Sequence, residues 1–220
     1  MIWCPNNGSI CSERATPMPN TVLLIASDNK IGVPRVQIED TIKSVLRDKG
    51  IQLIFASDYR KGGNILCKIC KLAQQVQFGI LIYDNKVQKR TIPNLFYESS
   101  LMHYLGKELI MIGYKTRRPS DLESVEWIKY DEKEFKPAFE QRVKNIFAMQ
   151  AYFESVADNE IATGNYLVGI EYLKKLLLMG PTIPIADKMA EVNAKIKKIE
   201  AREFSNNIHF VTMTRKGLNH

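Results

Sequence analysis

The chain has 220 residues, a formal net charge of +7 at pH 7 and a pI of about 9.1. Its 45% hydrophobic and 25% charged residues are typical of a globular protein and exclude a disordered or collagen-like chain. No apolar stretch approaches the length of a membrane span, and no secretory signal is visible, so we expect a cytoplasmic protein without membrane partners. The positive charge is compatible with an anionic nucleotide or with nucleic acid, and it does not favour nucleic acid.

The four cysteines are Cys4, Cys11, Cys67 and Cys70. In a reducing compartment they are expected to be thiols. The first pair is too widely spaced for a usual zinc knuckle, and the second forms a CxxC inside a helical pattern. We therefore predict buried or incidental thiols and no metal, with a four-cysteine zinc site as the open alternative.

Strands and helices alternate through the first two thirds of the chain. Residues 1–20 are rich in Pro and Asn and predict an N-terminal arm. The predicted strands are Thr21–Ala26, Ile51–Ala56, Phe78–Tyr83, Leu109–Ile112 and Ser124–Lys129, and the predicted helices cover residues 34–48, 64–76, 93–105 and 132–150. In the first helix, Val36, Ile38, Ile42, Val45 and Leu46 form the expected apolar side. The pattern predicts a five-stranded parallel sheet with helices on both faces, a flavodoxin-like α/β domain over residues 21–148.

A helical extension is predicted over residues 149–204, followed by a loosely held tail over 205–220. Its expected helices are Ala151–Thr163, Tyr166–Met179 and Ile183–Phe204. Residues 151–181 resemble one tetratricopeptide-type hairpin, with Gly164, Asn165, Tyr166 and Pro181 at fitting positions. One such hairpin cannot form a core alone, so we expect it to pack on the α/β domain or to form an oligomer or partner interface.

The most informative residue is Glu98, which shares a helical stripe with Leu95, Met102 and Leu105. A carboxylate within an apolar stripe is unfavourable to bury unless it is paired or has a function. It also follows the third strand closely, at the edge where open α/β sheets bind ligands. Pairing with Lys107 or Arg90 is the open structural alternative.

Other polar residues follow the predicted strands and converge on the same edge. They are Ser27, Asp28, Asp58, Tyr59, Asp84, Asn94 and Tyr97. Such residues also cap helices and form turns, and this alternative stays open for Asp84 and Asn94. His103 is a lone histidine, and neither a P-loop nor a GxGxxG sequence is present.

The segment IPNLFYESSLMHYLGKELIMI, residues 92–112, resembles the TIR-like and nucleoside 2-deoxyribosyltransferase-like superfamily. The shared pattern is Pro-Asn, two aromatic residues, a glutamate, a helix ending in Leu-Gly-Lys and an apolar strand. Weaker similarity extends from Thr21 to Phe147, and Ser99-Ser100 stand where Leu-Gly is usual. The resemblance implies that Glu98 acts on the ribose of an N-glycoside.

The resemblance further implies that NAD is the substrate and that no cofactor is needed. Asp84 and Asn94 would bind the ribose hydroxyls, and Tyr59 or Tyr97 would stack on the base. Ser27 would hold phosphate together with nearby backbone N–H groups, and Asp28 beside it belongs to the same binding site. The basic residues Lys30, Arg60 and Arg90 would add positive charge.

The favoured function is therefore an NAD glycohydrolase or cyclase of the kind that serves prokaryotic antiviral defence, controlled by self-assembly or a protein partner. One alternative is a nucleoside deoxyribosyltransferase or nucleotide N-glycosidase. Another is a non-catalytic nucleotide sensor or adaptor. The trigger, the partner, the oligomeric state and the choice between linear and cyclic ADP-ribose stay open.

Overall fold

The computed structural model describes residues 15–27, 33–59, 65–84, 91–114, 126–179 and 183–217. The strands are β1 (Thr21–Ile25), β2 (Gln52–Phe55), β3 (Phe78–Asp84), β4 (Leu109–Tyr114) and β5 (Trp127–Lys129). The helices are α1 (Val33–Asp48), the 3-10 helix η1 (Ala56–Tyr59), α2 (Ile65–Gln75), α3 (Ile92–Tyr104), α4 (Phe135–Ala162), α5 (Tyr166–Met179) and α6 (Ile183–Gly217). The chain divides into two units, residues 1–150 with 178–180 and residues 151–177 with 181–220, which are described separately.

The first unit is built on a five-stranded sheet in the order β2-β1-β3-β4-β5, with every neighbouring pair parallel. All five residues of β1 are buried, as expected for a strand covered on both faces. In the register of the sheet, Leu24 lies beside Phe55 of β2 and Ile80 of β3. The predicted fold class, a parallel α/β sheet followed by a helical region, is confirmed.

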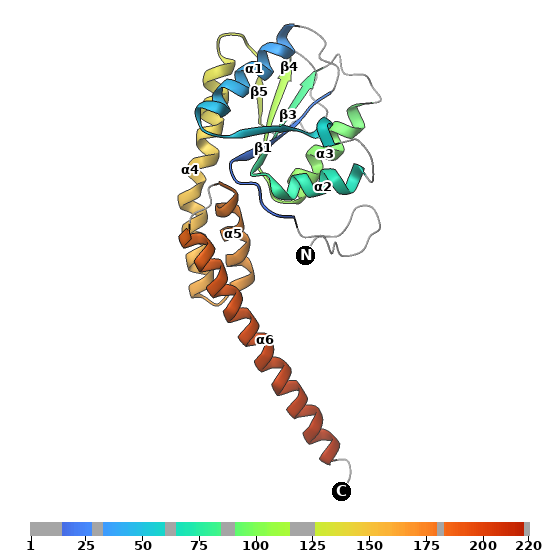
Figure 1. Cartoon of the computed structure of the whole chain (residues 1–220), viewed down its shortest axis with the longest axis vertical. Coiled ribbons are helices and arrows are strands. Elements are labelled where there is room, and N and C mark those ends of the chain that lie inside the picture. The colour runs from blue at the N-terminus through green and yellow to red at the C-terminus, as the bar shows by residue number, and fades with distance from the viewer. Residues whose placement is uncertain are drawn as a thin grey trace. The chain divides into compact units, whose positions relative to one another are not determined.

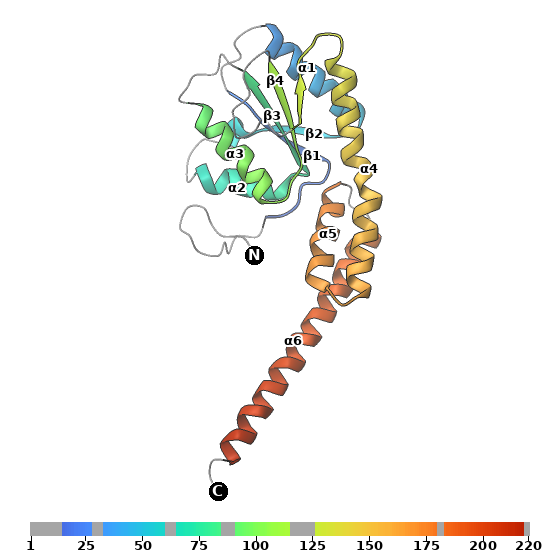
Figure 2. The ribbon, with the colours of Figure 1, turned by 180° about the vertical axis from the view of Figure 1, so that it is seen from behind.

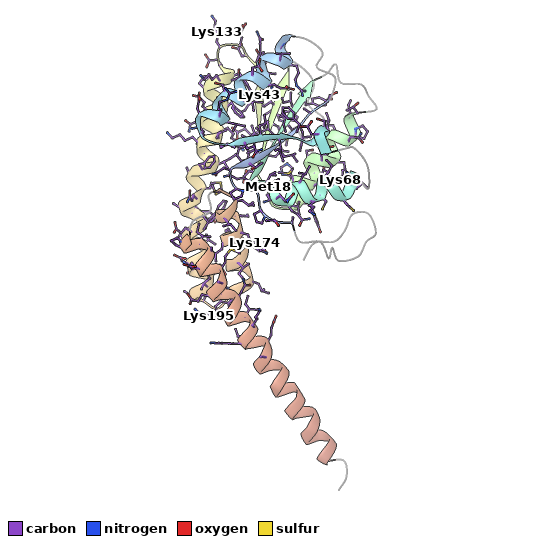
Figure 3. All side chains as sticks on the ribbon, in the orientation of Figure 1. Met18, Lys43, Lys68, Lys133, Lys174 and Lys195 are labelled. Atoms are coloured by element: carbon purple, nitrogen blue, oxygen red, sulfur yellow. The ribbon has the colours of Figure 1, made fainter. Side chains whose placement is uncertain are left out.

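Alternation along the strands supplies one hydrophobic core to each face of the sheet. Val22 and Leu24 pack in a core with α1 and the first half of α4, whereas Leu23 and Ile25 pack in a core with α2 and α3. The two helical layers lie on opposite faces of the sheet (Figure 1, Figure 2). The side chains fill both layers between helices and strands (Figure 3). The α3 helix is therefore fixed against the sheet by apolar contacts on the same side as α2.

Glycine ends α3 as the sequence predicts. Gly106 has φ of +66°, a conformation that glycine adopts without steric cost. Its N–H donates to the His103 carbonyl at 2.9 Å, and the Lys107 N–H donates to the Met102 carbonyl at 2.9 Å. These two bonds form a Schellman motif, which satisfies carbonyls that the end of the helix would leave unbonded. The strand β4 begins three residues after this turn.

Two helices are longer than predicted. The helices predicted over 132–150 and 151–163 form the single helix α4, because no Gly or Pro interrupts residues 138–163. In the same way α6 continues to Gly217, through most of the residues predicted as a tail, because no Gly or Pro occurs between Pro184 and Gly217. Extending an existing helix is far easier than starting one, so weak helix formers in these segments are carried along.

The second unit is a packed group of helices formed by the end of α4, α5 and the first part of α6. Gly169 of α5 permits a close approach to α4, since a Cβ there would lie 2.7 Å from Ile161 Cγ1. The rings of Phe153 and Tyr172 lie 5.8 Å apart between the same two helices. Lys188 of α6 pairs with Asp158 of α4. The unit thus has its own apolar contacts and ion pairs.

We expect Gly79→Val to destabilise the first unit. A Cβ at Gly79 would lie 2.8 Å from Leu109 Cδ1 and 3.1 Å from Met102 Cε, so a larger side chain overpacks the core between β3, β4 and α3. Overpacking of this kind lowers the free energy of unfolding by about 1–3 kcal/mol. Urea unfolding followed by tryptophan fluorescence measures the change, because Trp127 belongs to that core. The exposed substitution Ser100→Val is the control, and equal midpoints for the two variants would contradict the packing assignment.

Candidate functional site

The sheet order defines a topological switch point between β1 and β3. The chain leaves β1 into α1 on one face of the sheet, and it leaves β2 and β3 into α2 and α3 on the other face. Connections that diverge in this way leave room for a ligand at the carboxyl ends of the two strands. Ser27 follows β1 at this point and Asp84 ends β3. The predicted site therefore falls at the carboxyl edge of the sheet, beside α3.

Glu98 is buried on α3, with 4% of its surface exposed. Leu95 and Met102, its neighbours in the predicted stripe, are fully buried, and Leu105 packs partly buried against the same core. The stripe is therefore confirmed. That core also contains Ile25 of β1 and Leu81 of β3, the two strands that flank the switch point. Glu98 therefore lies on the face of the sheet that α2 and α3 cover.

Asn94 lies one helical turn before Glu98 and is exposed. Residues four apart share one side of an α-helix, so Asn94 lies on the same side of α3 as Glu98 and one turn closer to the start of the helix. Tyr97 is half-buried beside them and packs against the core between α2, α3 and the sheet. Three of the predicted site residues thus occupy neighbouring positions at the start of α3. An exposed hydrogen-bonding group above a buried acid is suited to a polar ligand that enters from the edge.

Three aromatic rings form a cluster between the carboxyl end of β3, the start of β5 and the first half of α3. Tyr83 lies 5.8 Å from Phe96 and 6.2 Å from Trp127, measured between ring centroids. A helix turns by about 100° per residue, so Phe96 and Glu98 lie on opposite flanks of the Leu95–Met102 stripe. The cluster fixes the flank of α3 that faces β5. This cluster was not predicted from the sequence, because its members come from three separate elements.

A buried ion pair supports the end of β1. Arg35 and Glu39 of α1 are 5% and 1% exposed, and Arg35 Nε lies 2.8 Å from Glu39 Oε1. Arg35 Nη2 also donates to the carbonyl oxygen of Ser27 at 3.4 Å, and Ser27 is itself buried. The guanidinium therefore joins the first turn of α1 to the residue that leaves the central strand.

This ion pair was not predicted from the sequence. The signal was present, because Arg35 and Glu39 are four residues apart and share a helical side with Ile38 and Ile42, which are buried as predicted. The prediction that Val36 faces inward is wrong, since 45% of its surface is exposed. The charged pair occupies the inward positions at the start of α1 instead.

The other predicted site residues are described in part or not at all. Tyr59 ends η1 and Asp84 ends β3, and only their backbone positions are described. Asp28, Lys30, Arg60 and Arg90 lie outside the described residues, as do Cys4 and Cys11 of the alternative zinc site. On α2, Cys67 is exposed and Cys70 is buried, with Gln74 Nε2 3.4 Å from Cys70 Sγ. His103 is exposed on α3.

Within the described part of the chain, no three His, Cys, Asp or Glu residues gather as ligands for a metal ion. None of its helices combines the length and the apolar content that crossing a bilayer requires.

Comparisons with protein-family models, with curated proteins and with solved structures found no match. By its fold, the chain is a doubly wound, all-parallel α/β domain followed by a helical unit. Any narrower assignment depends on the residues of α3 and their resemblance to the TIR-like pattern.

We expect Glu39→Leu to lower the free energy of unfolding by about 3–5 kcal/mol, because it leaves the Arg35 guanidinium buried without its carboxylate. The double variant Arg35→Met/Glu39→Leu removes both charges and should recover most of that loss. Urea unfolding of the single and double variants measures the coupling. Asp40, an exposed acid on the same helix, gives the control Asp40→Asn, expected within about 0.5 kcal/mol of the parent. A loss in the double variant as large as in Glu39→Leu would contradict the ion-pair account.

Proposed function

We propose that this protein cleaves an N-glycosidic bond of a nucleotide, with NAD as the substrate and nicotinamide as the leaving group. The observation that carries the proposal is the buried carboxylate of Glu98 on α3, the helix that follows β3. The resemblance of residues 92–112 to the TIR-like pattern supports the same residue. A buried acid at a ligand-binding edge is a candidate for catalysis on physical grounds as well.

Cleavage of the bond between nicotinamide and ribose can be assisted by a single carboxylate. As the bond between nicotinamide and C1′ of the ribose breaks, its electron pair leaves with the base and positive charge develops on the ribose. A carboxylate stabilises that charge more strongly in a water-poor site than in bulk water. The nicotinamide ring of NAD is cationic and leaves as a neutral base, so no group has to protonate it. Water then adds to C1′ and releases a proton, which gives ADP-ribose.

The neighbouring residues supply binding rather than bond breaking in this proposal. Asn94, exposed one turn above Glu98, binds a ribose hydroxyl at the mouth of the site. Tyr97 provides an apolar wall beside it. Ser27 and the backbone that follows β1 receive the phosphates, and Arg35 holds the carbonyl of Ser27 in place. In the cell, such an activity would serve as a defence effector governed by assembly or by a protein partner.

We expect purified protein to release nicotinamide from NAD, and Glu98→Gln to lower the rate by at least about 10²-fold, as loss of one charge-stabilising group commonly does. Chromatography of nicotinamide and ADP-ribose over a range of protein concentrations measures the rate and detects activation by assembly. Glu108→Gln, an exposed acid just before β4, is the matched control and should leave the rate unchanged.

Other outcomes would redirect or end the proposal. Base exchange on deoxynucleosides with NAD left intact would favour a deoxyribosyltransferase. Stabilisation by a nucleotide without turnover would favour a sensor or an adaptor. An unchanged rate in folded Glu98→Gln would remove the carboxylate from the mechanism. Thermal unfolding of each variant ensures that a lost rate is not a lost fold.

A further inference from the structure

A hollow of about 360 Å³ lies at the amino end of β2, beside α1. It is lined by Lys43 and Arg47 of α1 and by Gly50, Ile51, Gln52 and Leu53 at the start of β2. Figure 3 labels Lys43 on α1, the helix that covers this face of the sheet. The hollow therefore joins two cationic side chains to the amino end of β2, and it is independent of the candidate site.

The strand β2 is at an edge of the sheet, and among the described strands it pairs with β1 alone. The N–H of Gln52 donates to the carbonyl of Asn20 at 2.7 Å, so Gln52 faces β1. Because the backbone groups of successive residues in a strand point to opposite sides, the N–H and C=O of Leu53 point away from β1, to the side of β2 where no described strand lies. An open edge of this kind is a template for an added strand.

The two cations have the spacing that an added strand requires. Lys43 and Arg47 are four residues apart, which is about 6 Å along a helix. Side chains on one face of a strand are two residues apart, which is about 6.6 Å. An extended peptide with the sequence acidic-any-acidic would thus place one carboxylate against each cation while its backbone pairs with β2.

The Lys43 side chain lies against an aromatic ring, and its carboxylate neighbours are at long distances. Its ammonium lies 5.8 Å from the centroid of the Phe55 ring of β2. It is 3.7 Å from Asp40 and 3.8 Å from Glu39, beyond ordinary hydrogen-bond distance in both cases. Arg47 is exposed at the other end of the hollow. Both cations can therefore meet carboxylates from outside the chain.

We propose that the hollow receives an extended acidic segment of a partner protein, which adds to β2 as a strand and places two carboxylates, two residues apart, on Lys43 and Arg47. A second copy of this chain fits less well, since pairing β2 with β2 about a two-fold axis would bring the same cations from both copies together. Nucleic acid offers phosphates, but it has no backbone that pairs with the edge of a sheet.

The probe is a capped, fluorescein-labelled decapeptide of alternating Thr and Val with Glu-Val-Glu at its centre. Fluorescence anisotropy with the full chain should show saturable binding that weakens as salt is added. The double variant Lys43→Gln/Arg47→Gln should weaken binding about tenfold, as expected from two partly exposed ion pairs. Lys49→Gln removes a nearby exposed cation that does not line the hollow, and it should change binding less than twofold.

Altered peptides test the geometry. A peptide of the same composition with adjacent glutamates places them on opposite faces of the strand and should bind about as weakly as a variant lacking one cation. N-methylation of the amides on the peptide edge that faces β2 should remove binding, because it blocks the backbone hydrogen bonds to that strand. The proposal is overturned by absent saturation, by undiminished binding of either altered peptide, or by displacement with a single-stranded oligonucleotide of equal charge. Dimers that exclude the peptide, and that tighten in the double variant because the repulsion between the cations is gone, would assign the edge of β2 to a second copy instead.

Discussion

The parallel pairing of β1 with both β2 and β3 is the constraint on which the rest of the first unit depends. All five residues of β1 are buried, so the strand requires helices on both faces of the sheet. The chain meets this requirement by sending α1 to one face and α2 and α3 to the other. That divergence creates the switch point at the carboxyl ends of β1 and β3. The position of the candidate site is therefore a consequence of how the central strand is covered.

Two buried glutamates lie on opposite faces of this sheet, and burial alone does not distinguish their roles. Glu39 has the Arg35 guanidinium at 2.8 Å, and Arg35 also reaches the Ser27 carbonyl, so that acid has a structural explanation in the support of β1. Glu98 is placed differently, one turn below the exposed Asn94 at the start of the helix that follows β3. Its position relative to the switch point, together with the resemblance of its segment, assigns it the catalytic role in the proposed function.

The strands and the burial of Glu98 were predictable because they depend on local patterns. A short apolar run such as Thr21–Ile25 is compatible with few structures other than a buried strand, and the 3.6-residue period places Leu95, Glu98 and Met102 together.

The continuity of α4 was missed because helix ends were expected at a change of composition, whereas the helix ends just before Gly164, which has φ of +87°. The Arg35–Glu39 pair was missed because Val36, as the apolar residue, was expected to face inward. Which of these residues is buried depends on the neighbouring elements, and these are not visible in the local sequence. Distances between separate elements, such as those that join Tyr83, Phe96 and Trp127, are not encoded in any local pattern.

The helix α1 connects the two ends of the sheet through charges at every fourth residue, Arg35, Glu39, Lys43 and Arg47. Its first pair is tight, at 2.8 Å and buried, whereas Lys43 is 3.8 Å from Glu39 and partly exposed. An acidic group arriving at the hollow would therefore compete with Glu39 for Lys43 only, and Glu39 would keep its stronger partner. Because Arg35 rather than Lys43 holds the Ser27 carbonyl, occupation of the hollow leaves the support of β1 intact. The geometry of α1 thus allows binding at the amino end of β2 without breaking the ion pair on which the carboxyl end of β1 depends.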